Sequence, residues 1–273
     1  MAQLPNRSSD FDSYNGNGEP SEPLFVPSMG SMLSDFYVNQ KLSLKLDLPA
    51  AREPILDLFN RLKKEFPGLS TLRRIENEVA LESDDQQQCY SWLSIGSTRL
   101  DSGYANPTDL GDAYRLHRKI LELAPYFLSI SPIDIDHLEL IFGFDLEAQA
   151  NRHAIVFDAL MSDSPLAELV GRDEEVLESH PALAIALEPS SNVQAFIDVK
   201  ARTSPRERET RNWNREPISV ILAVRYTGAL HSLNDLPACF AALAGHAERI
   251  TEERLVPNIV EPIRQAIIAR PSF

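Results

Sequence analysis

Acidic side chains and a histidine gather near the middle of the chain, at Asp134, Asp136, His137 and Glu139. These residue types ligate metal ions and transfer protons in active sites. Successive side chains on a strand point to opposite faces, so His137 and Glu139 are expected to share one face with Asp145. We interpret His137, Glu139 and Asp145 as a polar sheet face. Catalysis is the alternative, although no second His or Cys at ligand spacing completes a metal site.

A basic segment between positions 200 and 215 is the second group of side chains that can bind a ligand. It reverses the acidic character of the chain and contains only Glu207 and Glu209 as acidic residues. Guanidinium groups bind carboxylates and phosphates, and an indole ring can stack on a guanidinium or a planar ligand. Three interpretations follow: pairing with the chain's own carboxylates, contact with a protein partner, or binding of phosphate or nucleic acid. The candidate residues are Lys200, Arg202, Arg206, Arg208, Arg211, Trp213 and Arg215.

Motifs for cofactor-dependent chemistry do not occur in the sequence. No Gly-rich phosphate loop follows a predicted strand, and the remaining histidines stand alone. Cys89 and Cys239 lie too far apart for a zinc motif, and each is interpreted as a small buried thiol. We therefore predict no catalytic residue, no metal and no cofactor. A non-enzymatic protein is favoured, and enzymatic activity stays open.

The charge balance limits the class of partner. A formal net charge of -14 opposes binding to nucleic acid or to an anionic membrane, because phosphate contacts require a basic surface. The first residues lack the basic and apolar regions of a secretory signal, and no apolar stretch is long enough to span a bilayer. We predict a cytoplasmic protein that contacts no membrane and whose partner is a protein or a second copy.

The elements that position these side chains begin after a leader. Residues 1–38 are rich in Pro, Gly, Ser and Asn and are predicted to be disordered, apart from an apolar run over 24–37 that can dock on the core or on a partner. Residues 39–130 then predict a strand, a helix, two strands over 70–82 and 89–104, and a second helix capped by Thr108 or Asp109.

Residues 131–273 predict a similar series. Alternating apolar residues over 138–146 indicate a strand, and a helix follows. Strands are predicted over 182–188, 193–203 and 217–227, with antiparallel pairing because the connections are short. The closing helical segment contains Pro257 and Pro262, which are expected to kink or divide it.

Taken together, these elements predict an α+β fold. Two similar strand-helix-strands-helix repeats form antiparallel sheet, packed by helices, and a disordered N-terminal leader precedes them. The basic segment and the long closing helix occur only in the second repeat, which makes a specialised interaction more expected there.

The layout resembles a sporadically distributed family of uncharacterised bacterial proteins of about 250 residues. The resemblance rests on the opening strand and helix from Leu42 to Phe66, the strand Pro217 to Tyr226, and the closing helix Leu255 to Val260. It extends over most of residues 40–268. It implies the fold and a bacterial origin, but no activity.

Two functional hypotheses follow from the sequence. The first is a non-enzymatic protein-interaction or assembly protein that uses sheet edges, the basic segment or the leader, and that forms a homo-oligomer. The second is a small-ligand-binding protein or enzyme with a cavity between sheet and helices, in which His137, Glu139 or the basic segment holds an acidic ligand.

Overall fold

One nine-stranded antiparallel sheet organises the structure, a computed structural model that describes residues 33–48, 51–75, 78–84 and 89–270. The strand order is β2-β3-β4-β5-β1-β6-β9-β8-β7. The predicted α+β class and antiparallel pairing are confirmed. Most of the predicted leader lies outside the described residues, and its last six positions, 33–38, belong to the first strand.

The two longest strands lie side by side within the sheet. They are β1 (Leu33–Leu44) and β6 (Ile135–Ala148), which pair antiparallel with Val38 opposite Phe142. The predicted strand rested on alternating leucines that begin at Leu42, but the buried face of β1 already includes Phe36 and Val38. That alternation also runs past the strand's end, because the chain bends after Leu44 and leaves Leu46 64% exposed.

The other strands of the first half continue the sheet from β1. They are β5 (Arg99–Ala105), β4 (Tyr90–Ile95), β3 (Glu78–Ser83) and, at the edge, β2 (Leu69–Ile75). Each strand predicted over 70–82 and 89–104 is therefore two strands. A tight turn separates β4 from β5, where the Gly96 N–H donates to the Arg99 carbonyl at 3.0 Å. Sequence alternation continues through such a turn, which hides the reversal.

The second half continues the sheet from the other side of β6. β9 (Glu216–Tyr226) pairs with β6, β8 (Val193–Ala201) follows, and β7 (Ala182–Ala186) forms the far edge. These strands lie where the sequence predicts them, with ends that differ by a few residues. Because β1 and β6 pair directly, residues 39–130 and 131–273 contribute to the same sheet.

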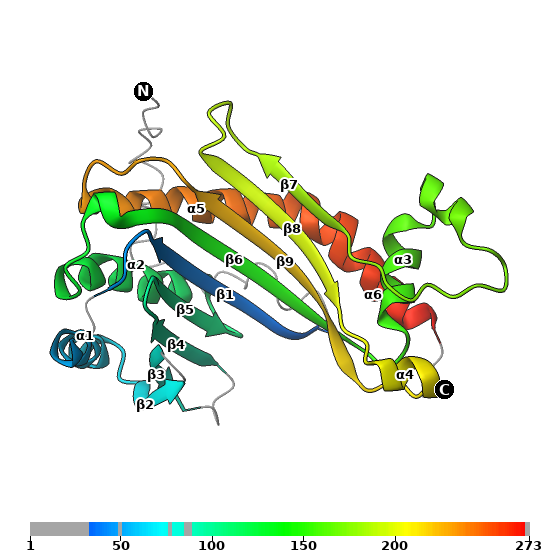
Figure 1. Cartoon of the computed structure of the whole chain (residues 1–273), viewed down its shortest axis with the longest axis horizontal. Helices are drawn as coiled ribbons and strands as arrows, with labels where there is room; N and C mark the ends of the chain where they lie inside the picture. Colours follow the sequence, from blue (N-terminus) through cyan, green and yellow to red (C-terminus); the bar gives the residue numbers. More distant parts are fainter. Residues whose placement is uncertain (1–32, 49–50, 76–77, 85–88, 271–273) are drawn as a thin grey trace, which may run out of the picture.

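Helices cover one face of the sheet (Figure 1). α2 (Leu110–Phe127) and α5 (Leu236–Ile250) pack on its central strands, α1 (Arg52–Glu65) packs beside α2, and α3 (Arg152–Met161) packs against α6 (Glu261–Ala269). The Asp109 side chain accepts a hydrogen bond from the Gly111 N–H, so one of the two predicted caps of α2 is confirmed. In the described ranges, no helix has the length and apolar character needed to cross a bilayer.

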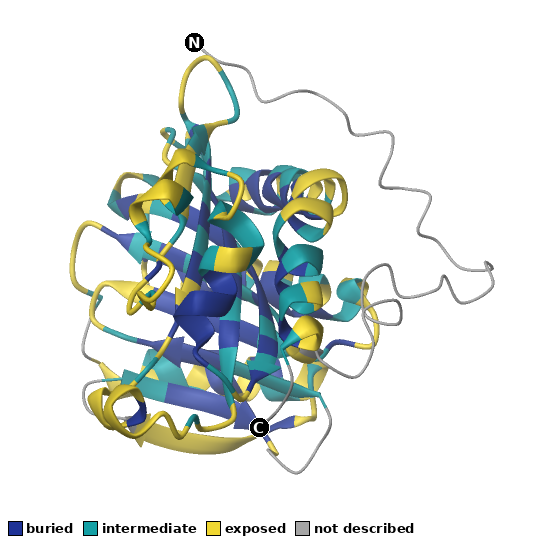
Figure 2. Cartoon of the chain, turned by 90° about the vertical axis from the view of Figure 1, so that its right-hand side faces the viewer, coloured by how far each residue is buried: buried dark blue, intermediate teal, exposed yellow. Residues whose placement is uncertain are grey.

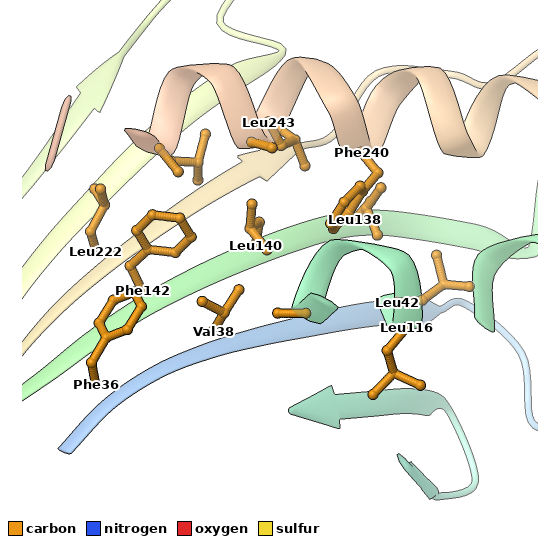
Figure 3. Packing of buried hydrophobic residues seen from close by; sticks show 14 of the residues in the cluster. Phe36, Val38, Leu42, Leu116, Leu138, Leu140, Phe142, Leu222, Phe240 and Leu243 are labelled. Atoms are coloured by element: carbon orange, nitrogen blue, oxygen red, sulfur yellow. The ribbon is translucent and has the colours of Figure 1, made fainter. Parts of the chain in front are cut away.

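The core lies between this helix layer and the long strands (Figures 2 and 3). Phe240 and Leu243 of α5 point toward Leu138 and Leu140 of β6, and all four side chains are buried. Phe36 of β1 meets Phe142 edge to face, with ring centroids 5.7 Å apart. Each aromatic side chain of this kind removes a large apolar area from water, so residues of both halves stabilise one core.

The closing helix runs without a break from α5 to α6 through a π-helical segment, Thr251–Val260. Pro257 has no N–H, and in a regular α-helix its ring would collide with the carbonyl of Glu253. The wider turn relieves this collision: the N–H of Glu261 donates to the Val256 carbonyl, five residues back. The expected kink or division at Pro257 is therefore a local change of helical pitch.

Candidate functional site

The sheet face opposite the helices is the most extended candidate surface. Within the described ranges it carries no helix layer, and along β1, β6, β8 and β9 most of its side chains are partly exposed, whereas most of those on the other face are buried. Along every long strand, residues of this face alternate with residues of the core face, because successive side chains point to opposite sides. We call it the open face.

Its middle row is apolar and aromatic except at one asparagine on β1. Strand register aligns Trp92 of β4 with Gly103 of β5, Ile141 of β6 with Ala223 of β9, and Ala223 in turn with Phe196 of β8. The row crosses β1 at Asn39, which pairs with both Gly103 and Ile141. An apolar row that crosses several strands and is bordered by polar side chains has the anatomy of a protein-binding surface.

Two large aromatic rings lie flat across glycines of this face. A Cβ atom added at Gly103 would collide with the Trp92 indole, and one added at Gly143 would collide with the Tyr37 ring. Glycine is required at both positions because any side chain would occupy the volume that the ring fills. The pairs belong to neighbouring strands, Trp92–Gly103 to β4 and β5 and Tyr37–Gly143 to β1 and β6.

A row of alternating charges borders the apolar row. Register places Asp101, Lys41, Glu139 and Arg225 side by side on β5, β1, β6 and β9. Arg225 donates to Glu139 Oε1 from Nε at 3.0 Å and from Nη2 at 2.8 Å, and its guanidinium lies 4.7 Å from the centroid of Phe196. Because the charges alternate in sign, the row offers neither the basic stripe that binds nucleic acid nor an uncompensated acidic patch.

The predicted polar face of β6 is therefore part of the open face, but its three members do not converge. Glu139 is buried in the ion pair with Arg225. His137 binds Asp136 through Nδ1 at 2.8 Å. Asp145 lies eight residues further along the strand than His137, about 27 Å away at the usual strand rise. In the described part of the chain, no three His, Cys, Asp or Glu side chains are placed to hold a metal ion.

Asp145 occupies a polar end of the open face, next to Tyr37. Burial raises the pKa of Asp145 against the opposing effect of its hydrogen bond with Ser219, and the nearby Asp35 raises it further. Burial, with the charge of Asp145, raises the pKa of Tyr37 to about 12, against the effect of Arg202. Tyr37 therefore stays protonated at neutral pH and can only donate or accept hydrogen bonds there.

The basic segment folds into a short helix, α4 (Pro205–Thr210), between β8 and β9. Three of its cations pair with carboxylates of the same chain: Lys200 with Asp198 at 3.2 Å, Arg211 with Glu175 at 3.6 Å, and Arg215 with Glu147. The remaining candidates Arg202, Arg206 and Arg208 have exposed side chains, and Trp213 is half-buried. The arrangement supports the intramolecular interpretation for the three paired residues.

A buried ion pair that sequence reasoning missed anchors this segment. Arg152 at the start of α3 is fully buried and donates to Glu207 of α4 at 2.8 Å, to the Arg202 carbonyl at 2.6 Å and to the Asn214 carbonyl at 2.7 Å. The serine and glutamate spacing of Ser204 and Glu207, a capping box, is the sequence signal that predicts α4. No sequence signal pairs it with Arg152, since more than fifty positions separate the two.

Glu207 is held ionised by this environment. Burial would raise its pKa, but hydrogen bonds from Arg152, from the backbone N–H groups of Ser204 and Asn214, and from the Ser204 hydroxyl lower the pKa to about 2. Arg152 and Glu207 therefore satisfy one another and the surrounding backbone. Their role is to hold the basic segment against α3.

The thiols differ in environment. Cys239 is buried, as predicted, and burial raises its pKa to about 12. Cys89 is only half-buried, and its Sγ lies 2.9 Å from the Asn106 carbonyl oxygen. A thiolate is the reactive form of cysteine, so Cys239 is unreactive at neutral pH.

Comparison of the chain with known protein families found no match, and comparison with curated proteins found no significant similarity.

Proposed function

We propose that this chain is a non-enzymatic protein-interaction or assembly protein that binds a protein partner on the open face of its sheet. The supporting observation is the apolar row of Trp92, Ile141 and Phe196, which crosses the sheet on a face without helices in the described ranges. An antiparallel sheet with one face in water usually has polar side chains on that face. An aromatic row on the uncovered face therefore favours a contact surface.

The partner expected from this chemistry is a protein segment with apolar side chains at its centre. Glu139 and Arg225 already neutralise one another next to the row, so they add hydrogen-bonding groups without a strong field. A nucleic acid requires several unpaired cations in one line, and the alternating row does not supply them. Apolar contact is therefore expected to contribute most of the binding free energy, and charge to contribute less.

The test uses a photoreactive benzophenone amino acid at Ile141, incorporated in the full chain in its own cells. The matched control is Ile268, which is the same residue type on α6 and is 55% exposed. We expect position 141 to cross-link to a defined protein and position 268 not to do so. Equal products at both positions, or none at 141, would contradict the open-face proposal.

A second candidate is a ligand site between sheet and helices. The amide of Gln40 on β1 supports it, since this side chain is buried and neither of its polar atoms has a hydrogen-bond partner in the described residues. Its register partner Ser102 lies 2.9 Å from His117 Nδ1, so two of the three neighbouring polar groups satisfy one another. A small-molecule thermal-shift screen tests this candidate, and a hit whose effect is lost in Gln40→Leu would support it.

The same architecture favours an internal duplication. We infer that the halves arose from one repeated unit, because each begins with a central strand, β1 or β6, continues through a helix, α1 or α3, and antiparallel strands, and ends in a long helix, α2 or α5. The two first strands pair with one another at the junction. Comparison of the halves across homologous sequences tests this inference: unrelated patterns of buried positions would argue against it.

A further inference from the structure

The two edges of the sheet differ in how they are protected. β2 carries the exposed cations Arg73 and Arg74. β7 consists of Ala182-Leu183-Ala184-Ile185-Ala186, with no charge and no proline, and four of its five residues are exposed. Natural proteins usually protect an edge strand with charges, proline or a covering segment, because free backbone groups pair with other strands. β7 has neither charge nor proline.

Hydrogen bonds at both ends of β7 establish which backbone groups are free. The Leu187 N–H donates to the Val193 carbonyl and the Val199 N–H donates to the Pro181 carbonyl, so the odd-numbered residues of β7 exchange bonds with β8. In an antiparallel ladder the intervening residues direct their N–H and C=O groups to the other side. These are Ala182, Ala184 and Ala186, whose methyl groups leave room for another backbone.

We propose that β7 pairs with β7 of a second copy of this chain, antiparallel, about a two-fold axis at Ala184. This inference goes beyond the proposed function, because it concerns the sheet edge and not the open face. The axis places Ala184 opposite Ala184 of the second copy and Ala182 opposite Ala186 of the second copy. Even-numbered residues then face one another, which is the register that satisfies their free N–H and C=O groups.

The side chains of β7 suit this self-pairing. The sequence reads nearly the same in both directions, so Leu183 lies opposite Ile185 of the second copy on one face and alanines meet on the other. Leu183 is 57% exposed, and the pairing covers it with an apolar side chain. A two-fold interface requires such self-complementarity, whereas an unrelated peptide does not.

Polar side chains at the ends of the strand agree with the same register. It brings His180 opposite Glu188 of the second copy, and the two-fold axis repeats this pair at the other end. The side chain of His180 is 44% exposed and lies 3.1 Å from Glu178 in its own chain, so it can reach a second carboxylate. A hydrogen bond between an imidazole and a carboxylate at both ends favours the register centred on Ala184 over a shift along the strand.

Light scattering of the full chain tests the pairing. We expect a mass of about twice 30.6 kDa for the unaltered chain. Leu183→Lys places a charge opposite Ile185 of the second copy and should raise the dissociation constant by at least about tenfold. The matched control is Leu72→Lys on the opposite edge strand β2, where Leu72 is 49% exposed, and it should leave the dimer intact.

A cysteine scan then tests the register in a Cys89→Ser background, where Cys239 is buried and unreactive. Ala184→Cys brings two thiols together across the axis, at the Cα separation of about 5.5 Å that a disulfide accepts. Ala182→Cys separates its two copies by about 14 Å along the strands and should not link. Oxidation should therefore give a covalent dimer only for Ala184→Cys.

Three outcomes would overturn this inference: a monomer at all concentrations, a dimer that Leu183→Lys leaves unchanged, or equal linking through positions 182 and 184. Cross-linking at Ile141 remains a separate measurement, because Leu183→Lys changes the sheet edge and leaves the open face unaltered. A monomer that still cross-links at Ile141 would refute the self-pairing of β7 and preserve the proposed function.

Discussion

Arg152 shows how one residue determines the conformation of a distant segment. Its guanidinium is fully buried, and all three of its hydrogen-bond acceptors belong to the segment that joins β8 to β9. Arg152→Met would leave the buried Glu207 carboxylate without its cation, and two partly buried carbonyl groups would lose the donor that Arg152 supplies. We expect the free energy of unfolding to fall by about 3–5 kcal/mol, measured by denaturant unfolding.

The control for Arg152 is a double-mutant cycle with Glu207→Gln. Because the two side chains bond directly, the double variant should lose less stability than the sum of the single variants. Additive losses would show that the pair is not coupled. Arg206→Met, a change of the same kind on the exposed side of α4, should alter stability by less than about 0.5 kcal/mol.

His117 predicts a specific pH dependence of stability. Burial lowers its pKa from 6.5 to about 4, against a smaller opposing effect of its bond to the Val38 carbonyl. The unfolded chain therefore takes up a proton near pH 6.5, whereas the folded chain does so only near pH 4. Stability from this residue is complete above pH 6.5 and is lost as the pH falls toward 4, by up to about 3 kcal/mol.

The measurement for His117 compares urea unfolding at several pH values for the unaltered chain and for His117→Gln. The difference between the two free energies should shrink between pH 6.5 and 4, because only the unaltered chain loses the contribution of this imidazole. His153 and His246 also have a lowered pKa through burial, so the comparison must use the difference and not the raw slope. A difference independent of pH would contradict the prediction.

At the scale of elements, Gly143 of β6 leaves the space that the Tyr37 ring of β1 occupies. An added Cβ would collide with that ring, so Gly143→Ala should cost about 1–3 kcal/mol of unfolding free energy. Gly245 in α5 has no neighbour within 4 Å of the position an added Cβ would take, and Gly245→Ala should stabilise the helix by up to about 1 kcal/mol. The same substitution is thus expected to act with opposite sign in the two elements, as thermal or denaturant unfolding can measure.

A second substitution separates the steric cause from other effects of Gly143. If the ring is responsible, Tyr37→Ala should remove most of the cost of Gly143→Ala, so that the glycine substitution changes stability little in a Tyr37→Ala background, because the smaller side chain makes room for the new methyl group. Failure of this rescue would locate the cost in the backbone of β6.

At the scale of the whole molecule, the shared sheet predicts cooperative unfolding. Phe142 lies in the core on β6, pairs with Val38 of β1, and touches Phe36 from the other half. Phe142→Ala should cost about 3–5 kcal/mol. We expect this loss to shift the unfolding of both halves together, since the β1–β6 ladder and the core join them.

Hydrogen exchange measures this cooperativity. Amides of β4 in the first half and β8 in the second half should lose protection in parallel when Phe142→Ala is introduced. Loss confined to β8 and its neighbours would indicate two independent units, at the division near residue 130 that the sequence suggests.

The local elements could be predicted because their causes are local. Alternation over 193–203 depends only on which residues are apolar, and β8 lies there; Asp109 caps α2 because its own side chain reaches the N–H of Gly111. Pairing could not be predicted in the same way. The apolar pattern continues unchanged on both sides of the turn between β4 and β5 and of the π-helical segment at Pro257. The pattern therefore does not reveal either feature.

The features of the candidate surfaces also separate into those with local causes and those that depend on pairing. Composition and spacing alone establish the acidic charge, the basic segment and the common face of His137, Glu139 and Asp145. Only the tertiary structure decides that Glu139 is neutralised by Arg225, that Arg152 anchors Glu207, and that Trp92 and Phe196 join Ile141 in one row. The physical reason is range: side-chain periodicity acts within a few residues, whereas strand register and burial bring together groups that lie about fifty or more positions apart in the sequence.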